Sequence, residues 1–185
     1  TGPNDNVIKI SCFHGTTIRS HPSQVKMADR SQKRDDFFRV QSHTNEMTFY
    51  LNTLSKVLTA GDLTARELTE TCLEAIASEE GNRAFIDVYS DRVRIEADHI
   101  DKARQNGLAL PPFAGIPLSI KDLFDVRGEV TRAGSTVMAD NAAATTDALV
   151  VSRLKAAGFI LIGRTNMTEF AFSGLGMNPH YGNPR

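Results

Sequence analysis

Four large apolar residues stand together at Phe159-Ile-Leu-Ile162, with no polar residue between them. A strand with one face in water alternates apolar and polar residues, so this unbroken run predicts a strand that is buried on both faces. Such strands occur where helices cover both sides of a sheet. Residues 148–157 predict a helix that leads into this strand, with Thr146 or Asp147 as its N-cap. Gly158 ends that helix.

The first half of the chain predicts mainly helices. Apolar residues recur at helical spacing over residues 51–58, and Gly61 ends that helix. Thr64-Ala-Arg-Glu67 has the pattern of a capping box, which opens a second helix that ends near Gly81. The other elements expected here are a strand at 84–89 and a helix at 91–106 that Gly107 ends.

The second half alternates between strands and helices. Besides the elements at 148–162, it predicts a strand at 116–121 and a short helix, capped by Thr165 or Asn166, that carries Met167, Phe170 and Ala171. Helices followed by such alternation predict an α/β fold. We expect N-terminal helices followed by part of a mixed or mainly parallel sheet that helices cover.

The composition favours a cytoplasmic globular protein. The 185 residues carry a net charge of −1, which creates no long-range field to attract nucleic acid or an anionic membrane. No apolar run approaches the ~18 residues that a membrane-spanning helix needs. Cys12 and Cys72 are too few and too far apart for a disulfide framework, so a reducing compartment is expected.

Neither a metal nor a cofactor is expected. The five histidines are scattered without the close spacing of a metal-binding pair, and no run of acidic residues resembles a calcium loop. Gly174-Leu-Gly176 lacks the third glycine of a dinucleotide-binding loop, and Pro179 follows where a helix should begin.

Residues 1–46 are interpreted as a leader of unknown role. Residues 1–44 hold seven Lys or Arg and four Asp, with little apolar periodicity. A nucleic-acid arm would fit the basic excess, but the interspersed acids favour a solvated extension that is disordered or not native to the protein. The chain begins at Thr1 rather than Met and stops at Arg185 within a predicted loop, so we expect it to be a piece of a longer reading frame.

Lys121 is the candidate catalytic residue that the strand pattern suggests. The period of two in the strand at 116–121 places Ile116, Leu118 and Ile120 on one face and Pro117, Ser119 and Lys121 on the other. A lysine at the end of such a strand occupies the position where α/β proteins place their sites. Partial burial there lowers the pKa of an ammonium group, and a neutral amine can act as a base. The strand pattern alone fits a solvated lysine better than a catalytic one and leaves both open.

Several segments in order carry a more specific signal. They are Pro112-Phe-Ala-Gly-Ile-Pro-Leu-Ser-Ile-Lys-Asp-Leu-Phe-Asp-Val126, Thr131-Arg-Ala-Gly-Ser135, Asp147-Ala-Leu-Val-Val-Ser-Arg-Leu-Lys-Ala-Ala-Gly158, Gly163-Arg-Thr-Asn-Met-Thr-Glu-Phe-Ala-Phe-Ser173 and His180-Tyr-Gly-Asn-Pro184. Together they resemble the amidase signature family, and the helical run before them is similar to its N-terminal helices. The resemblance covers about residues 47–185, which would form the N-terminal part of a single domain, an incomplete amidase signature fold that stops before the Ser/Gly-rich loop.

The resemblance implies an amide hydrolase with a Ser–Ser–Lys triad in which Lys121 is the base. Lys121 would take a proton from a bridging serine, held on a cis peptide, and that serine would take one from the nucleophilic serine. In the family both serines lie in a Gly/Ser-rich stretch beyond this chain, so neither role is assigned here. The serines weighed and left unassigned are Ser119, Ser135, Ser152 and Ser173. Ser135 is interpreted as a turn or helix-cap serine.

Three residues are expected to support the site. Asp122 would orient the loop after Lys121 by accepting backbone amides in a turn. Thr165 and Asn166 are interpreted as helix-cap residues with a supporting role near the site.

The resemblance also implies a segment that contacts the substrate. Ala171, Phe172 and Ser173 correspond to a family segment that lines the acyl pocket. For Phe172 and the neighbouring Phe170, packing in the core fits about as well as contact with substrate.

The leading interpretation is the N-terminal part of a cytoplasmic amidase that acts on a small-molecule amide, with a homodimer compatible with the sequence. A rival in the same family is the glutaminase-type subunit of a tRNA-dependent amidotransferase. That subunit would need partner chains, and the near-neutral charge gives no support for direct contact with tRNA. From another class, a non-catalytic α/β binding module would explain the absence of the nucleophile.

Overall fold

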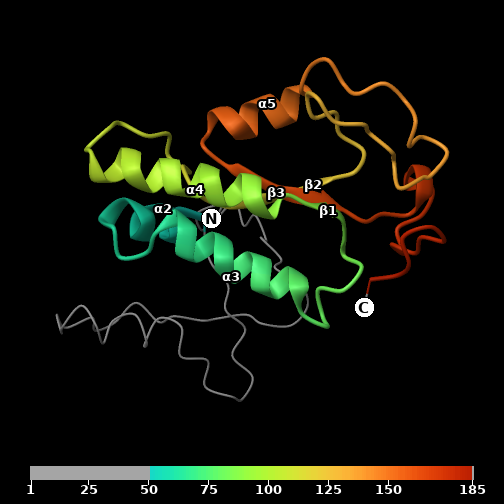
Figure 1. Ribbon diagram of the computed structural model, residues 1–185, viewed down its shortest axis with the longest axis horizontal. Helices are drawn as coiled ribbons and strands as arrows, with labels where there is room; N and C mark the ends of the chain where they lie inside the picture. Colours follow the sequence, from blue (N-terminus) through green and yellow to red (C-terminus); the bar gives the residue numbers. More distant parts are fainter. Residues whose placement is uncertain (1–50, 185) are drawn as a thin grey trace, which may run out of the picture.

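The computed structural model describes residues 51–184 (Figure 1). Its helices are α2 (Leu51–Ala60), α3 (Ala65–Ala77), α4 (Ser90–Gln105) and α5 (Leu149–Ala156), with a 3-10 turn η1 (Glu169–Ala171), and its strands are β1 (Phe85–Val88), β2 (Pro117–Lys121) and β3 (Ile160–Thr165). The predicted leader at 1–46 lies outside the described residues, and its role stays a prediction.

The strands form a mixed sheet with β3 in the centre. The strand order is β1-β3-β2, with β2 parallel and β1 antiparallel to β3. This arrangement confirms the predicted α/β fold with a mixed sheet. Because β2 and β3 are parallel, their carboxyl ends lie at the same edge of the sheet.

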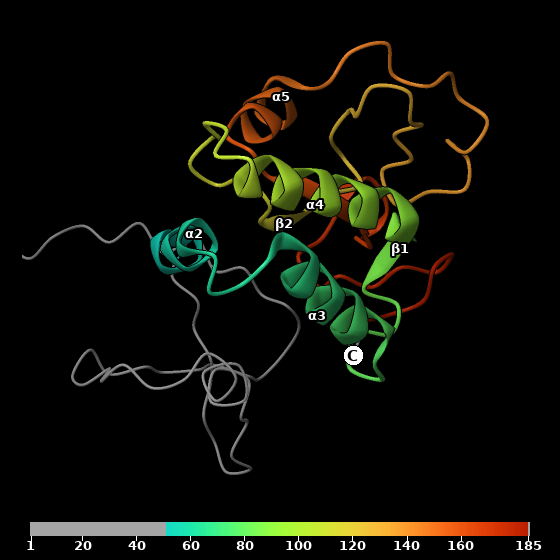
Figure 2. The same ribbon diagram turned by 60° about the vertical axis from the view of Figure 1, so that its left-hand side comes forward.

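The central strand is buried on both faces, as the apolar run predicts. Ile162 packs in the core formed with α2, α3 and α4, whereas Leu161 packs with Val151 of α5. Figures 1 and 2 show the same division, with α5 on one side of the strands and α3 and α4 on the other. The helices therefore cover both sides of β3.

The helices α2, α3 and α4 form a layer, called the helical layer below, whose buried interior consists largely of apolar side chains. The predicted capping box begins α3: the hydroxyl of Thr64 accepts from the amide of Glu67 at 3.1 Å, and the Glu67 carboxylate accepts from the Thr64 amide at 3.0 Å. Asp101 of α4 adds a second cap, because its carboxylate accepts from the amides of Ala65 and Arg66 at 2.8 and 2.9 Å. The amino end of α3 is therefore completed by its neighbour α4.

Two predicted helix caps are wrong. Ala148, not Thr146 or Asp147, holds the N-cap position of α5 and makes no side-chain cap bond. The Asp147 carboxylate instead accepts from the Arg127 amide at 2.7 Å and from Lys155 Nζ at 2.9 Å, and these bonds lower its pKa. The Asp147 carboxylate therefore bonds a distant backbone amide and the last turn of α5 instead of the amides at the start of that helix.

The second wrong cap concerns the short helix after β3. Only the 3-10 turn η1 forms there, and Thr168 holds its N-cap position without a side-chain bond. The Asn166 side-chain oxygen accepts from the Met167 amide at 2.8 Å, and its amide nitrogen donates to the carbonyls of Arg83 and Gly182 at 2.9 and 2.8 Å. Asn166 therefore ties the end of β3 to two segments that are distant in sequence and does not cap a helix.

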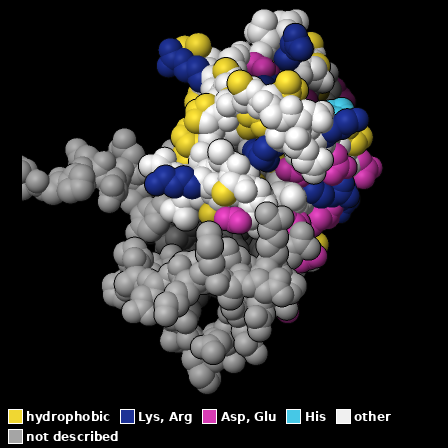
Figure 3. All heavy atoms as spheres, turned by 90° about the vertical axis from the view of Figure 1, so that its left-hand side faces the viewer, with side chains coloured by type: hydrophobic (Ala, Val, Ile, Leu, Met, Phe, Trp, Pro, Cys, Tyr) yellow, Lys and Arg dark blue, Asp and Glu magenta, His cyan; other side chains and the backbone are white. Residues whose placement is uncertain are grey.

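The described residues can be compared with the requirements of a membrane-spanning helix and of a metal site. Within residues 51–184, every helix is too short or too polar to cross a lipid bilayer. The same residues contain no cluster of three or more His, Cys, Asp or Glu side chains placed to hold a metal ion. On the face drawn in Figure 3, acidic and basic side chains lie close to one another.

Candidate active site

The candidate site lies at the carboxyl edge of β2 and β3. Lys121, the last residue of β2, pairs in register with Thr165, the last residue of β3. Thr165 in turn pairs with Phe85 at the start of β1. The loops that leave this edge, residues 122–135 and 166–184, are called the edge loops below. In open α/β sheets, ligands bind outside the carboxyl ends of the strands.

Lys121 is exposed at this edge. The predicted alternation holds over the end of β2, where Ile120 is buried between the exposed Ser119 and Lys121. It fails at Pro117, which is buried, because the register between β2 and β3 shifts between Leu118 and Ser119. The partial burial expected for Lys121 is not present in the described part of the chain.

The residue after Lys121 is anchored in the interior. Asp122 is 0% exposed, and its carboxylate accepts from the Gly134 amide at 2.9 Å and from Arg164 Nη1 at 3.0 Å. Its carbonyl accepts from the Ala133 amide at 2.8 Å. Asp122 therefore ties the beginning of the first edge loop to its end and to β3.

Arg164 connects this anchor to a larger polar cluster. Its side chain is 1% exposed, and besides Asp122 it donates to the Phe124 carbonyl at 3.2 Å and to the Glu129 carboxylate at 3.0 Å. Tyr89 also donates to Glu129. Arg92 donates to the same carboxylate at 3.0 Å and lies over the Tyr89 ring, 3.9 Å from its centroid.

The cluster shifts the pKa values of Glu129 and Tyr89. Burial raises the pKa of Glu129, but hydrogen bonds from Tyr89, Arg92 and Arg164 outweigh burial and leave that pKa below its usual value. Burial and the Glu129 carboxylate raise the pKa of the Tyr89 phenol. Glu129 is thus held as a carboxylate and Tyr89 as a neutral donor.

Ser135 lies in a buried turn. Its hydroxyl donates to Glu169 Oε1 at 2.5 Å and accepts from the Val137 amide at 3.2 Å. The preceding Gly134 has a φ of 71°, and a Cβ there would lie 2.8 Å from the Met167 carbonyl oxygen. These contacts fit the predicted turn serine.

Asn178 joins the two edge loops, although it is not among the residues predicted from the sequence. It is 2% exposed, and its amide donates to the carbonyls of Gly134 and Met167 at 2.6 and 2.7 Å. Its side-chain oxygen accepts from the amides of His180 and Tyr181. The only signal in the sequence is that an asparagine precedes a proline, which is typical of a turn.

The residues expected to contact substrate lie on the surface. Ala171, Phe172 and Ser173 are exposed, and the Phe172 side chain is 92% exposed. Phe170 and Ala171 have φ angles of 52° and 56°, a left-handed conformation that non-glycine residues seldom adopt. Neither Phe170 nor Phe172 belongs to the core of the described residues, so the alternative of core packing is wrong for both.

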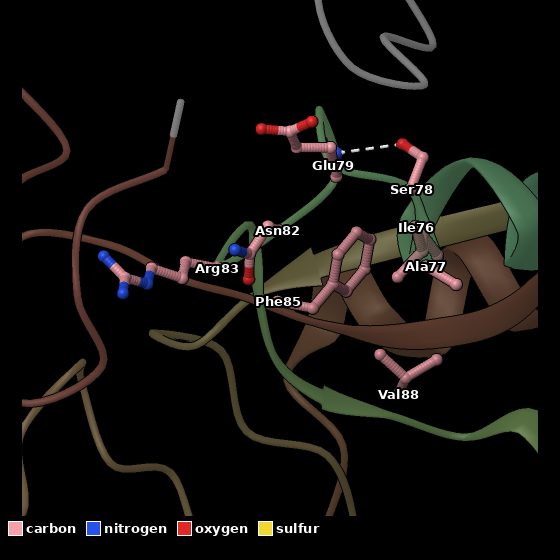
Figure 4. Close-up of a pocket in the computed structure, with 9 residues that line it drawn as sticks. Ile76, Ala77, Ser78, Glu79, Asn82, Arg83, Phe85 and Val88 are labelled. Atoms are coloured by element: carbon pink, nitrogen blue, oxygen red, sulfur yellow. Dashed lines mark hydrogen bonds between the residues drawn. The ribbon is translucent and has the colours of Figure 1, made fainter.

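A cavity of about 400 Å³ opens beside β1 (Figure 4). It is lined by the end of α3, the turn after it and β1, including Ile76, Arg83, Phe85 and Val88. No predicted site residue lines it, and β3 separates it from the strand that carries Lys121. This cavity is therefore distinct from the candidate site.

Comparisons with known proteins bear on this site. The amidase family profile matches residues 67–185. The chain is 43% identical over 129 residues to the AtzE subunit of 1-carboxybiuret hydrolase from Pseudomonas sp. (strain ADP), a match that covers 69% of this chain and 28% of the relative. It is 45% identical over 118 residues to a subunit of the glutamyl-tRNA(Gln) amidotransferase from Synechococcus sp. (strain WH7803), a match that covers 63% of this chain and 24% of the relative.

Solved structures give the same result. The native peptide amidase of Stenotrophomonas maltophilia superposes with a TM-score of 0.63 at 31% identity, covering 73% of this chain and 29% of that one. Fatty acid amide hydrolase superposes with a TM-score of 0.65 at 20% identity, covering 73% of this chain and 24% of that one, and supports the fold alone. The chain thus spans roughly a quarter of the length of the relatives it matches.

Proposed function

Because the chain belongs to the amidase signature family, which hydrolyses amide C–N bonds, we propose that its complete protein is an amide hydrolase and that Lys121 is the general base. The observation that carries this proposal is the place of Lys121: exposed at the carboxyl end of β2, next to a buried Asp122 that fixes the loop behind it. An exposed amine on a fixed backbone can meet groups from the rest of a larger protein.

The proposed chemistry passes one proton along three side chains. Lys121 Nζ accepts a proton from a bridging serine, which accepts one from the nucleophilic serine as its oxygen attacks the amide carbonyl carbon. The C–N bond then breaks, the leaving amine takes the proton back from the lysine, and water cleaves the acyl-enzyme ester. By the resemblance to the family, both serines are proposed to lie in a Gly/Ser-rich stretch outside residues 1–185.

The exposed segment Ala171, Phe172 and Ser173 is proposed to contact the acyl part of the substrate. The exposed Phe172 ring offers an apolar surface that a substrate could cover. Phe172→Ala should then raise KM for amides with apolar acyl groups while changing kcat little, because the ring would bind ground state and transition state alike. An unchanged KM for every acyl group would remove Phe172 from the substrate contact.

Substitution of Lys121 in the complete protein tests the base. General-base catalysis contributes roughly 10²–10⁴-fold, so Lys121→Ala and Lys121→Arg should both lower kcat by about 10³-fold. Arginine keeps the positive charge but does not give up its proton, so it separates a base from a cation that merely attracts substrate. Lys102→Arg, on the exposed part of α4, is the matched control and should leave kcat unchanged. An active Lys121→Arg variant would contradict the proposal.

A second function is favoured by the likeness to the glutamyl-tRNA(Gln) amidotransferase subunit. In that case the protein would release ammonia from glutamine within a complex of several chains. AtzE is likewise named as a subunit, so an assembly with partner chains is proposed for either activity. Assaying ammonia release from a panel of carboxamides that includes glutamine, with and without co-purified partners, separates the two. A protein that binds such amides but hydrolyses none of them would instead be a binding module.

A further inference from the structure

We propose that Arg164 is a positioning residue for Lys121: its buried guanidinium fixes the backbone that carries the base. This inference rests on the function proposed above. Arg164 lies on β3 opposite Ile120, the residue before Lys121, and it contacts the chain on the other side of Lys121 as well. The base is thus flanked by two segments that the same arginine holds.

The contacts of Arg164 concentrate on the turn that follows Lys121. Its Nη1 donates to Asp122 at 3.0 Å, and both Nη atoms donate to the Phe124 carbonyl at 3.2 Å. The Lys121 carbonyl closes the same turn by accepting from the amides of Leu123 and Phe124 at 2.7 and 3.2 Å. A single planar donor group therefore spans the whole turn.

The Lys121 side chain has no hydrogen bond or ion pair of its own within residues 51–184, so its position among them is set by its backbone. That backbone is held by its pairing with Thr165 of β3 and by the turn that Arg164 braces. A base must lie within hydrogen-bond reach of the proton it takes, and a displacement of about 1 Å can cost roughly 10²-fold in rate. Loosening the turn should therefore lower kcat.

Glu129 and Tyr89 extend the brace away from the site. Glu129 accepts from Arg164 Nε at 3.0 Å, which leaves the two Nη atoms free to face Asp122 and Phe124. Tyr89 and Arg92 hold Glu129 in turn. The cluster holds two arginines and two carboxylates, so it adds no net charge to the edge of the sheet that carries Lys121.

The burial of this cluster supports a role beyond stability. The Arg164 and Asp122 side chains are 1% and 0% exposed. Apolar residues of similar volume often stabilise a protein as well as a buried ion pair does. What apolar residues cannot supply is a directional grip on the Phe124 carbonyl and the Asp122 carboxylate.

The test compares Arg164→Lys with Arg104→Lys in the complete protein. Arg104 is a matched control because it also donates to a carboxylate, Asp101 at 3.2 Å, and to a carbonyl, that of Ala114 at 2.8 Å, but lies away from the site. Both variants keep the charge and should lower Tm. Only Arg164→Lys should lower kcat, by about 10-fold or more, with KM within about two-fold of the parent value. Equal kcat values for parent and Arg164→Lys would overturn the inference.

A second variant covers the case in which Arg164→Lys does not fold. Glu129→Gln keeps the shape of the side chain but removes the charge that orients Arg164, and it should lower kcat by about three-fold or more with KM unchanged. An unchanged kcat in Glu129→Gln would then overturn the inference. If Lys121→Arg is inactive while the Arg164 or Glu129 variant is fully active, positioning fails and the base stands. If Lys121→Arg is active, the proposed base fails first.

Discussion

The helical layer and the edge loops differ in what fills their interiors. The helical layer buries apolar side chains, among them Leu54, Leu58, Leu68, Leu73 and Val93, whereas the edge loops and the β3 residue that anchors them bury polar ones, namely Asp122, Ser135, Asn178 and Arg164. In the helical layer, ion pairs such as Arg66–Glu70 lie at the surface. At the edge loops, one ion pair, Arg164–Asp122, is fully buried.

This difference shows which part of the molecule depends on directional interactions. Apolar packing is non-directional and tolerates exchange of one side chain for another of similar volume. A buried polar group needs its partner at a defined distance and angle, and it costs free energy when the partner is missing. The edge that carries Lys121 is therefore the more sharply defined part of the molecule and the more easily broken by one substitution.

The largest expected effect is that of removing the buried cation. Arg164→Met leaves the Asp122 carboxylate buried without its partner, which should lower the free energy of unfolding by about 3–5 kcal/mol. Urea denaturation of the complete protein measures it. Adding Asp122→Leu should recover much of the loss, because replacing both members of a buried pair is often neutral. A loss below about 1 kcal/mol in the single variant would show that the edge loops do not depend on their buried ion pair.

The second largest loss of stability is expected from a substitution that creates a cavity in the helical layer. Leu58 is 1% exposed, and Leu58→Ala should lower the free energy of unfolding by about 3 kcal/mol. Because the lost contacts are apolar and far from β2's carboxyl end, kcat at a temperature where the variant is folded should not change. A fall in kcat comparable to that of Arg164→Lys would show that the two regions are coupled.

The link between the two edge loops is expected to contribute less. Asn178→Ala leaves the carbonyls of Gly134 and Met167 without their donor, which should cost about 2 kcal/mol. Asn52→Ala, on the exposed face of α2, is the control and should be nearly neutral. Hydrogen exchange should rise in residues 133–137 of the Asn178 variant and not in α3; a rise in both would contradict a local role.

The smallest effect concerns the surface carboxylate of the helical layer. Hydrogen bonds from Arg94 and then Arg66 lower the pKa of Glu70 from 4.5 to about 2. A lowered folded pKa means that the stabilisation is complete above about pH 4.5 and is lost as the pH falls toward 2. Since the side chains of Glu70 and its two arginines are each about a third exposed, the loss of free energy of unfolding should stay below about 1 kcal/mol. Urea midpoints of parent and Glu70→Gln should differ at pH 7 and converge near pH 2; a constant difference would exclude titration of Glu70.

The sequence allows the helical layer to be predicted because its signals are local. The spacing of Leu51 and Leu58 and the capping box at Thr64 lie within one or two helical turns. The run at 159–162 likewise predicts the buried strand, since each residue reports its own environment. The order of these elements predicts a mixed or mainly parallel sheet, and the antiparallel pairing of β1 with β3 makes it mixed.

In the edge loops the turn roles of Asp122 and Ser135 could be predicted, but the contacts that join residues far apart in sequence could not. Asn166 and Arg83 are 83 positions apart, and no periodic pattern encodes such a pair. Asn166 therefore looks like a cap until its distant acceptors are known. Arg164 lies two residues after the apolar run, in the same strand. A charged residue at that position is the only sign in the sequence of the buried ion pair.

The strand order has a consequence for how the chain folds as it is made. β3 lies between β1 and β2 yet is the last of them in sequence. At roughly 5–20 residues per second, β1 would leave the ribosome several seconds before its partner. The helices α3 and α4 can pack together before β3 is made, since both precede it in the chain and Asp101 of α4 accepts from the Ala65 amide of α3. A nascent chain paused before residue 160 would thus carry a docked helix pair beside two unpaired strands, the form in which a chaperone would meet it.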